Sequence, residues 1–466
     1  MQNKSTHADS SSPRPLGTAR LNDTPDSSKV VYAKTTIINV FFDGTNNNLY
    51  NIEAQRSGQR TPDPETNESY YNDFSNVANL FRNIPTKNKD GYFYIDGMGT
   101  TRLEDDDQDG YAMGTGKTGI VERANQAFEQ IVTYLKNLGN RPSHITLNVF
   151  GFSRGAATAR RFVSLCNTDA SKFGPFQDLQ WYVNFVGIFD TVSSYAQDKA
   201  TLLMQSKMGA DKKKAFSDDI SELKLKFDAR KINGNTYNWA RKVFHIVALD
   251  EFRINFALTN IASAVALGFG YEVKIPGAHS DIGGGYNAVV NEVQDFSALN
   301  DNNKLAFYAY LPYRGWYKPQ HMRADGGAQN SVRLQAWRTG ADAVKNNYSK
   351  ISYQMMKDMI NKYASYISFT DGKKVSDNHS DIQWLLDNWV PKALANDGAK
   401  SFTMPWPDKK DAWSQRIYHE FLHMSSNYKH SRGWTKPIVI PFEPNMELAT
   451  IDGQRTMIPK RIIYNG

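Results

Sequence analysis

The chain has 466 residues, of which 40% are hydrophobic and 12% aromatic, enough for one large folded domain and a second region. Lys and Arg total 55 against 48 Asp and Glu, so the net charge is +7; this suits an anionic lipid surface without requiring one, and no nucleic-acid partner is expected. The single cysteine, Cys166, excludes an internal disulfide framework, and no run of about 18 apolar residues predicts a membrane-spanning helix.

Residues 1–30 are rich in Ser, Thr, Pro and Asp and lack the apolar run of a cleaved signal peptide. We expect a disordered tail there, and export by a route that reads no cleaved signal. Strands are then predicted at residues 36–42, 92–95, 145–150, 183–189, 243–249 and 271–275. Helices are predicted at residues 120–138, 156–165 and 253–269, and a helical, Lys-rich insertion at about 198–231.

The most informative motif is G-F-S-R-G at Gly151–Gly155, placed between a predicted strand and a predicted helix. This context is typical of a nucleophile elbow, in which a serine sits on a strained turn with its hydroxyl exposed. Gly151 and Gly155 would allow the strand and helix to approach closely around the turn. The motif therefore predicts acyl transfer through an activated serine, Ser153.

Alternating strands and helices predict an α/β fold with a doubly wound, mostly parallel sheet. The order of the strands fits an α/β-hydrolase sheet, with 145–150 as its fifth strand and 36–42 and 92–95 as the third and fourth. We expect residues 31–300 to form the catalytic domain. Residues 301–466 are predicted to form a helical and irregular C-terminal cap, or a membrane- or partner-binding region.

A nucleophilic serine needs a histidine base that a carboxylate orients, and in this fold they follow in the order Ser, Asp or Glu, His. His279 lies in the loop after the last predicted strand, where the fold presents its base. Asp190 ends the strand at 183–189 and is the preferred acid. Asp250 ends the next strand and remains a rival, because both strand ends open onto the same edge of the sheet.

The oxyanion of an acyl-transfer intermediate needs backbone N–H donors. The N–H of Arg154, directly after the nucleophile, is one candidate. The loop after the strand at 36–42 offers the N–H groups of Gly44 and Thr45 as the second. Such chemistry needs no cofactor, and neither a cofactor nor a catalytic metal is expected.

One other motif suggests a different chemistry. His419–His423 reads H-E-F-L-H, which matches the zinc-peptidase pattern, and Glu443 follows as a possible third ligand. Glu443 lies in an extended, proline-bracketed stretch rather than on a helix, so a zinc-dependent peptidase is the less favoured alternative. A noncatalytic membrane-binding module on a hydrolase fold is another.

Five motifs together resemble the type VI secretion lipase effectors of the first family, phospholipases built on an α/β-hydrolase domain. They are F-F-D-G-T-N-N-N at 41–48, G-F-S-R-G-A-A at 151–157, G-I-F-D-T-V at 187–192, A-L-D-E-F-R at 248–253 and P-G-A-H-S-D-I-G-G-G-Y at 276–286. They occur in the expected order over residues 35–290, and the chain beyond 300 resembles the family only loosely.

The resemblance implies an antibacterial phospholipase of A1 or A2 type with Ser153, Asp190 and His279 as its triad. It also implies a spike protein that carries the effector into the periplasm of a neighbouring cell, and an immunity protein that protects the producer. Phospholipid membranes would be the substrate.

Overall fold

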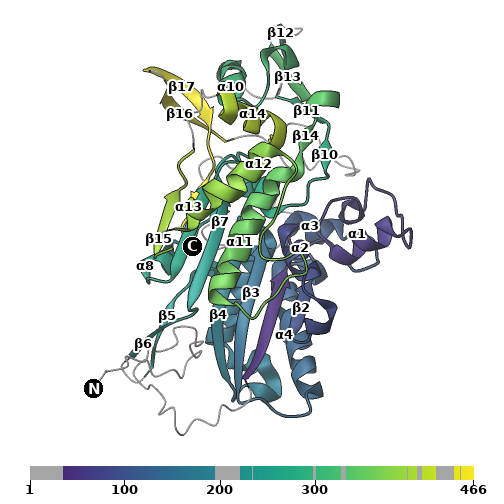
Figure 1. The fold of residues 1–466 in the computed structure, drawn as a ribbon, viewed down its shortest axis with the longest axis vertical. Coiled ribbons are helices and arrows are strands. Elements are labelled where there is room, and N and C mark those ends of the chain that lie inside the picture. The colour runs from purple at the N-terminus through teal and green to yellow at the C-terminus, as the bar shows by residue number, and fades with distance from the viewer. Residues whose placement is uncertain are drawn as a thin grey trace.

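The computed structural model describes residues 35–194, 221–232, 235–296, 301–326, 332–395, 397–406, 412–426, 445–451 and 453–466. The tail expected at residues 1–30 and most of the Lys-rich insertion expected at 198–231 lie outside this part of the chain. Its centre is a parallel sheet of seven strands in the order β15-β9-β7-β4-β3-β1-β2 (Figure 1). The strands are β1 (Thr35–Phe42), β2 (Tyr92–Ile95), β3 (His144–Phe152), β4 (Gln180–Phe189), β7 (Lys242–Ala248), β9 (Gly270–Ile275) and β15 (Lys400–Thr403).

The predicted α/β fold with a mostly parallel sheet is confirmed, and all six predicted sheet strands are present. The elbow strand β3 lies between β1 and β4, with β2 outside β1, as expected for the third to sixth strands of an α/β-hydrolase sheet. Because all strands run in parallel, their carboxyl ends share one edge of the sheet, where such folds bind ligands.

Both faces of the sheet are covered, because alternate side chains of each strand enter different cores. In β1, Val40 and Phe42 pack with helices α4 (Ile120–Asn137) and α5 (Arg154–Thr168) on one face. Phe41 points the other way and packs beneath α2 (Asn76–Arg82) and α11 (Ser349–Tyr363). Figure 1 shows α11 lying across the front of the sheet.

The helix predicted at residues 253–269 is wrong. The structure has a 3₁₀ turn at Ile254–Phe256, a short strand β8 (Leu258–Thr259) and a short helix α8 (Ala262–Ala266). β8 pairs with the C-terminal strand β18 (Ile463–Tyr464), and the Thr259 N–H donates to the Thr191 carbonyl. These long-range pairings outweigh the helical preference of the Ala- and Leu-rich sequence.

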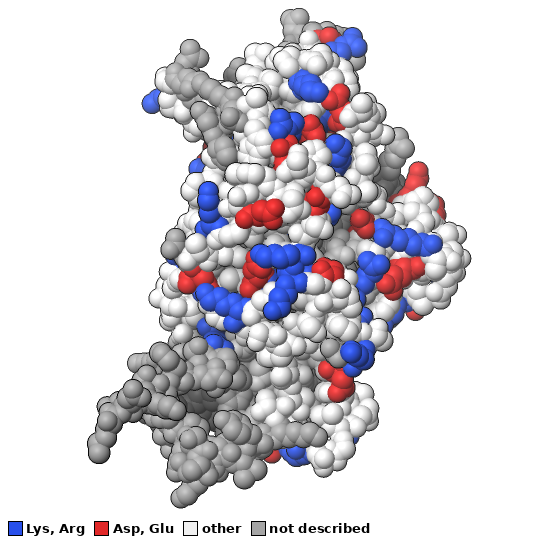
Figure 2. All heavy atoms as spheres, viewed as in Figure 1, with Lys and Arg blue, Asp and Glu red and all other residues white. Residues whose placement is uncertain are grey.

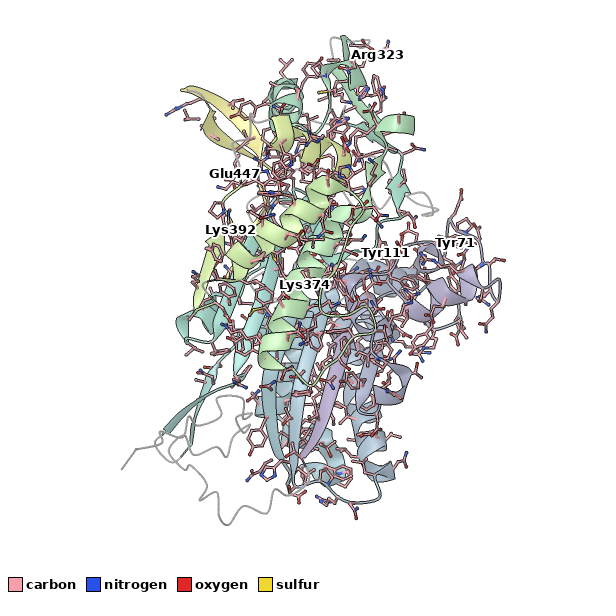
Figure 3. The ribbon with its side chains drawn as sticks, viewed as in Figure 1. Tyr71, Tyr111, Arg323, Lys374, Lys392 and Glu447 are labelled. Atoms are coloured by element: carbon pink, nitrogen blue, oxygen red, sulfur yellow. The ribbon has the colours of Figure 1, made fainter. Side chains whose placement is uncertain are left out.

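The chain beyond residue 300 contributes two elements to the core of the sheet. Helix α11 packs on one face, and β15 pairs with β9 as the outermost strand. Other parts of this segment form the end of the molecule at the top of Figure 1. Figure 3 labels Arg323, on β12, at the same end. The domain boundary at 300 stays a prediction, but the later segment and the sheet share one core. The elements of this end are β11 (Glu292–Asp295), α10 (Asp301–Arg314), β12 (Met322–Gly326), β13 (Val332–Arg338), α14 (Ala412–Phe421), β16 (Met446–Ile451) and β17 (Gln454–Pro459).

Shorter elements complete the fold. They are α1 (Leu49–Arg56), α3 (Gln108–Met113), β5 (Ala229–Ile232), β6 (Asn235–Asn238), α9 (His279–Gly283), β10 (Val289–Val290), β14 (Val344–Lys345), α12 (Ser380–Trp384) and α13 (Val390–Leu394). In the described ranges no helix combines the length and apolarity that crossing a membrane requires. Figure 2 shows acidic and basic side chains interspersed on the viewed face, so the charge of +7 forms no continuous basic patch there.

Candidate active site

The three residues expected to act together lie at the carboxyl edge of the sheet. Ser153 follows β3, Asp190 follows β4, and His279 begins α9 after β9. All three are buried, with exposed fractions of 4% for Ser153, 0% for Asp190 and 4% for His279.

Ser153 has the strained backbone of a nucleophile elbow. Its φ of 59° and ψ of −130° are costly for a residue other than glycine, by about 1–3 kcal/mol. Two hydrogen bonds hold the turn beside Asp190: the Ser153 N–H donates to the Phe189 carbonyl, and the Val192 N–H donates to the Ser153 carbonyl. The backbone of the serine is therefore tied to both sides of the residue expected to be the acid.

The two glycines of the elbow lie where a side chain does not fit. A Cβ on Gly155 would lie 2.2 Å from the carbonyl oxygen of Asp43, and one on Gly151 would lie 2.6 Å from the carbonyl oxygen of Gly155. Both clashes are with backbone, which cannot rotate away as a side chain can. The close approach of β1, β3 and α5 at the elbow therefore requires glycine.

Replacing Gly155 with alanine is expected to lower the free energy of unfolding by about 1–3 kcal/mol, because backbone must shift to admit the methyl group. Gly139→Ala is the matched control, since a Cβ at Gly139 meets nothing within 4 Å. Urea unfolding of both variants measures the difference. Equal stability of the two variants would contradict the close approach at the elbow.

His279 and Asp190 form a buried pair. The Nδ1 of His279 lies 2.6 Å from Oδ2 of Asp190. The His279 ring contacts two aromatic rings, those of Phe152 at a centroid distance of 4.6 Å and of Phe256 at 5.1 Å. The His279 N–H also donates to Glu251, so ring and backbone are both fixed.

The protonation states of this pair follow from burial and charge. Burial lowers the pKa of His279 below its ordinary value and so favours the neutral ring, although Asp190 acts in the opposite direction and raises the pKa. For Asp190, burial is outweighed by Arg461 and His279, which hold the pKa of the carboxyl below its ordinary range. The pair is therefore a neutral imidazole that donates from Nδ1 to a carboxylate.

Arg461 was not expected from the sequence. Its guanidinium contacts both oxygens of Asp190, with Nη1 at 2.5 Å from Oδ1 and Nη2 at 2.9 Å from Oδ2. The Ala248 N–H also donates to Asp190 Oδ1. Arg461 lies 271 residues from Asp190 in a C-terminal segment without a recognisable motif, so no local signal indicates this contact.

The rival acid Asp250 is occupied elsewhere. Its carboxylate accepts hydrogen bonds from the Gly277 N–H at 2.8 Å and from the Tyr418 hydroxyl at 2.9 Å, and it lies 3.5 Å from Arg314. Asp250 thus supports the loop that leads to His279, while the histidine side chain pairs with Asp190. The geometry favours Asp190 as the acid.

The expected oxyanion donors differ in their availability. Arg154 is the first residue of α5, so its N–H has no acceptor within the helix. The Gly44 N–H donates to the Asp43 carboxylate at 2.7 Å, which corrects the expectation that it is a free donor. Thr45 occupies the second position of a turn closed between Gly44 and Asn47, a position whose N–H the turn does not use.

The side chain of Arg154 holds the Thr45 loop in place. Its Nε donates to Thr45 Oγ1 at 2.7 Å, and its Nη2 donates to the carbonyl of Tyr111 on α3, labelled in Figure 3. Burial lowers the pKa of Arg154 to about 10, so the guanidinium stays charged at neutral pH. Within the described chain, neither Ser153 Oγ nor His279 Nε2 makes a hydrogen bond, which leaves both atoms available to a substrate.

The zinc-peptidase interpretation of H-E-F-L-H is wrong. Helix α14 ends at Phe421, so His423 lies beyond it and the two histidines do not share a helix face. His419 faces Asp342, whereas His423 binds Asp281 through Nδ1 at 2.7 Å. Glu443 lies outside the described residues.

Comparison with known proteins places this geometry in a family. The chain matches the family described as "T6SS, Phospholipase effector Tle1-like, catalytic domain" over residues 36–170 and 166–303, more than half of its length. These residues include all but the first residue of β1, the elbow, Asp190 and His279. No match was found among curated proteins.

Two solved structures match the chain. A Tle1 effector bound to the VgrG spike of the type VI secretion system is 21% identical, with a TM-score of 0.51, over 93% of this chain and 94% of that chain. An uncharacterized protein from Pseudomonas aeruginosa is 16% identical, with a TM-score of 0.39, over 77% of this chain and 51% of that chain. The first supports the fold over nearly the whole length, and the family match covers the predicted site. The chain therefore belongs to the Tle1-like family of type VI secretion system phospholipase effectors.

Proposed function

We propose that this effector is a serine esterase that hydrolyses fatty-acyl esters of glycerophospholipids, with phospholipase A1 or A2 activity. The observation that carries the proposal is the buried pair of His279 and Asp190 beside a serine in a strained strand-to-helix turn. A structural serine has no need of this backbone strain, which points to a functional role.

In the proposed mechanism, Ser153 Oγ attacks the ester carbonyl while His279 Nε2 takes the hydroxyl proton. Asp190 keeps the ring oriented and stabilises the imidazolium that forms. The N–H groups of Arg154 and Thr45 stabilise the oxyanion, with the Arg154 side chain fixing the Thr45 loop.

Collapse of the tetrahedral intermediate breaks the ester bond. The lysophospholipid alcohol leaves with the proton from His279, and the acyl group stays on Ser153. His279 then takes a proton from water, which attacks the acyl-enzyme; as the acyl–oxygen bond to Ser153 breaks, His279 returns that proton to Ser153 Oγ and the fatty acid is released. No cofactor enters this sequence.

The substrate is tested with vesicles of phosphatidylethanolamine and phosphatidylglycerol whose sn-1 and sn-2 acyl chains differ in mass. We expect the full chain to release fatty acid. Treatment with a fluorophosphonate should abolish this release, and a chelator should leave it unchanged. Vesicle binding without fatty-acid release would contradict the proposal and indicate a noncatalytic membrane-binding module.

The pH dependence follows from His279, which must be neutral to act as a base. As pH falls, activity is lost when the ring takes a proton, and burial lowers the pKa at which this happens below 6.5. We therefore expect the acidic limb of the kcat/KM profile on a soluble short-chain ester to lie below pH 6.5. A limb at or above pH 6.5 would contradict the described environment of His279.

Arg461 is proposed to position Asp190, and replacing it with glutamine is expected to reduce kcat by about 10- to 100-fold. The acidic limb should also move to higher pH, because losing a cation near the pair raises the pKa of His279. Arg461→Lys should restore part of both effects. A loss of activity with an unmoved limb would indicate that Arg461 serves stability alone.

As a type VI effector, the protein is delivered into target cells. We further propose that a spike protein carries it and that its target compartment is the periplasm, with a cognate immunity protein guarding the producer. Similarity in fold to an effector bound to the VgrG spike supports the first of these partners. Co-purification of the chain with the spike protein from its own secretion system tests that assignment.

A further inference from the structure

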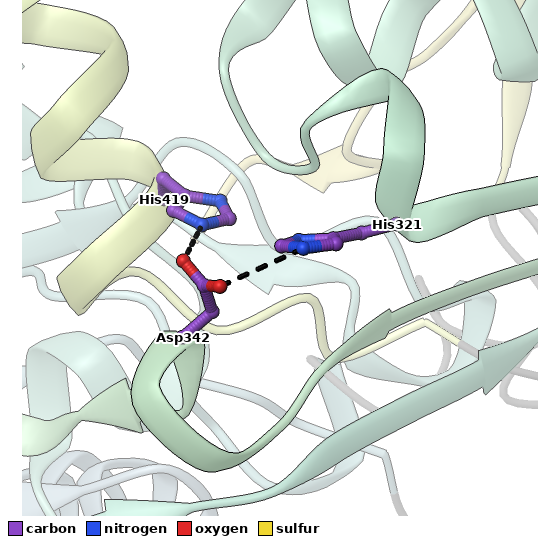
Figure 4. Close-up of side chains that lie close together, drawn as sticks. All are labelled: His321, Asp342 and His419. Atoms are coloured by element: carbon purple, nitrogen blue, oxygen red, sulfur yellow. Dashed lines mark hydrogen bonds and ion pairs between the residues drawn. The ribbon is translucent and has the colours of Figure 1, made fainter.

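Three potential metal ligands from distant parts of the sequence meet outside the proposed active site. His321 ends the 3₁₀ turn Pro319–His321, Asp342 ends the 3₁₀ turn Gly340–Asp342, and His419 lies on α14. One ligand atom of each residue lies within 4.8 Å of the others. Figure 4 shows both imidazole rings directed toward the carboxylate.

The two separations that involve Asp342 are close to those of ligands around a small cation. His419 Nε2 lies 3.1 Å from Asp342 Oδ1, and His321 Nε2 lies 3.6 Å from Asp342 Oδ2. With metal–ligand bonds of about 2.0–2.1 Å, tetrahedral ligand atoms lie about 3.3 Å apart. Small side-chain rotations would therefore bring the three groups around one ion.

The hydrogen bonds of His419 point to a cation as well. Its Nδ1 lies 3.2 Å from the carbonyl oxygen of Trp316, so this nitrogen must carry a proton. Its Nε2 lies 3.1 Å from Asp342 Oδ1, and a carboxylate at that distance requires either a second ring proton or a cation there. A metal ion at Nε2 would satisfy the carboxylate and leave the Nδ1–H bond to Trp316 as its outer support.

Asp342 is available as a ligand. Its Oδ1 is contacted by Lys318 and His419, while its Oδ2 lies 3.6 Å from His321 Nε2. Lys318 Nζ occupies Asp342 Oδ1 at 2.5 Å, but the Lys318 side chain is 46% exposed. Exposed ion pairs of this kind contribute little to stability, so a divalent ion can displace the ammonium group.

We propose that His321, Asp342 and His419 bind one divalent ion of the Zn²⁺ class, with solvent at the remaining position. Two imidazoles and one carboxylate are a ligand set that suits Zn²⁺ and related first-row ions. The ion would join the segment before β12, the segment after β13 and helix α14. This site shares His419 with the H-E-F-L-H motif but not His423, which is bound to Asp281.

The consequence of binding is structural. Helix α14 carries Tyr418, whose hydroxyl donates to Asp250, and Arg338 binds the carbonyls of Tyr418 and His419. An ion at His419 would fix the helix that supports the Asp250 loop. The proposal does not depend on the esterase mechanism.

The test uses the full chain stripped of metal and titrated with ZnCl₂ in a calorimeter. We expect one ion per chain, and an affinity that falls by about 100-fold or more in His321→Gln and Asp342→Asn. His379→Gln is the matched control, because His379 lies 3.5 Å from Glu420 in a pair with a single histidine and should bind as wild type does.

Two further readouts separate ligand loss from misfolding. Co²⁺ should give visible absorption bands with the wild type and the control but not with the two ligand variants. Zn²⁺ should raise the unfolding temperature of the wild type and of the control but not of the two ligand variants, while the metal-free proteins unfold alike. A wild type that binds no Zn²⁺, or ligand variants that bind as tightly as the wild type, would overturn the proposal.

Discussion

Replacing Ser153 with alanine is expected to reduce fatty-acid release from phospholipid vesicles by about 10⁴-fold or more, because the proposed acyl-enzyme cannot form. The fold should remain, since the Ser153 hydroxyl bonds no other described residue and its backbone contacts do not require the side chain. Rates are measured by mass spectrometry of the released acyl chains. Circular dichroism reports the fold.

Ser171→Ala is the matched control for this variant. Ser171 is exposed and bonds only the nearby Asp169 among the described residues, so its loss should leave the rate unchanged. If Ser153→Ala retained the wild-type rate, the serine mechanism would be rejected, whatever the family resemblance.

The second large effect is expected at Asp190. Asp190→Asn should reduce kcat by about 10⁴-fold, because an amide donor facing Nδ1 selects the wrong tautomer of His279. Asp250→Asn should reduce kcat far less, by about tenfold. The reason is that the Asp250 carboxylate contacts Gly277, Tyr418 and Arg314 rather than the ring of His279.

Stability must be measured for both variants, because each leaves a buried arginine without its carboxylate: Arg461 beside Asp190 and Arg314 beside Asp250. Breaking a buried ion pair typically costs about 3–5 kcal/mol. Rates are therefore compared at a temperature where both variants are folded. If only the Asp250 variant lost activity, the assignment of the acid would be reversed.

The sheet and the candidate triad could be predicted from sequence because their signals are local. Each strand is a short apolar run, and Ser153, Asp190 and His279 each follow such a run directly. Parallel strands then bring their carboxyl ends to one edge without further information. The order of the three residues along the chain then indicates which residue is the nucleophile, which the acid and which the base.

Other features depend on contacts between distant segments and have no local sequence signal. The Ala- and Leu-rich stretch at 253–269 reads as a helix, yet β8 within it pairs with the last strand of the chain. H-E-F-L-H has helical spacing, but α14 ends at Phe421, before its second histidine. Arg461 binds Asp190 only because the fold brings the C-terminal segment to that residue.

Residues of the C-terminal segment support the loops of the candidate active site. Tyr418 binds Asp250, His423 binds Asp281, and Ser425 donates to Glu251, which in turn accepts the N–H of His279. Together with Arg461, these contacts hold the proposed acid, Asp190, and the loop that carries the proposed base, His279. A membrane- or partner-binding role for residues 301–466 remains a prediction alongside this support.

The central claim is that Ser153 is activated by His279 and Asp190, and active-site labelling tests it without knowledge of the substrate. The full chain is treated with a fluorophosphonate, digested and sequenced by mass spectrometry. We predict one adduct, on Ser153, whose rate of formation falls sharply in His279→Gln and in Asp190→Asn but not in Asp250→Asn. Labelling at another residue, or labelling of Ser153 at an unchanged rate in His279→Gln, would contradict the account.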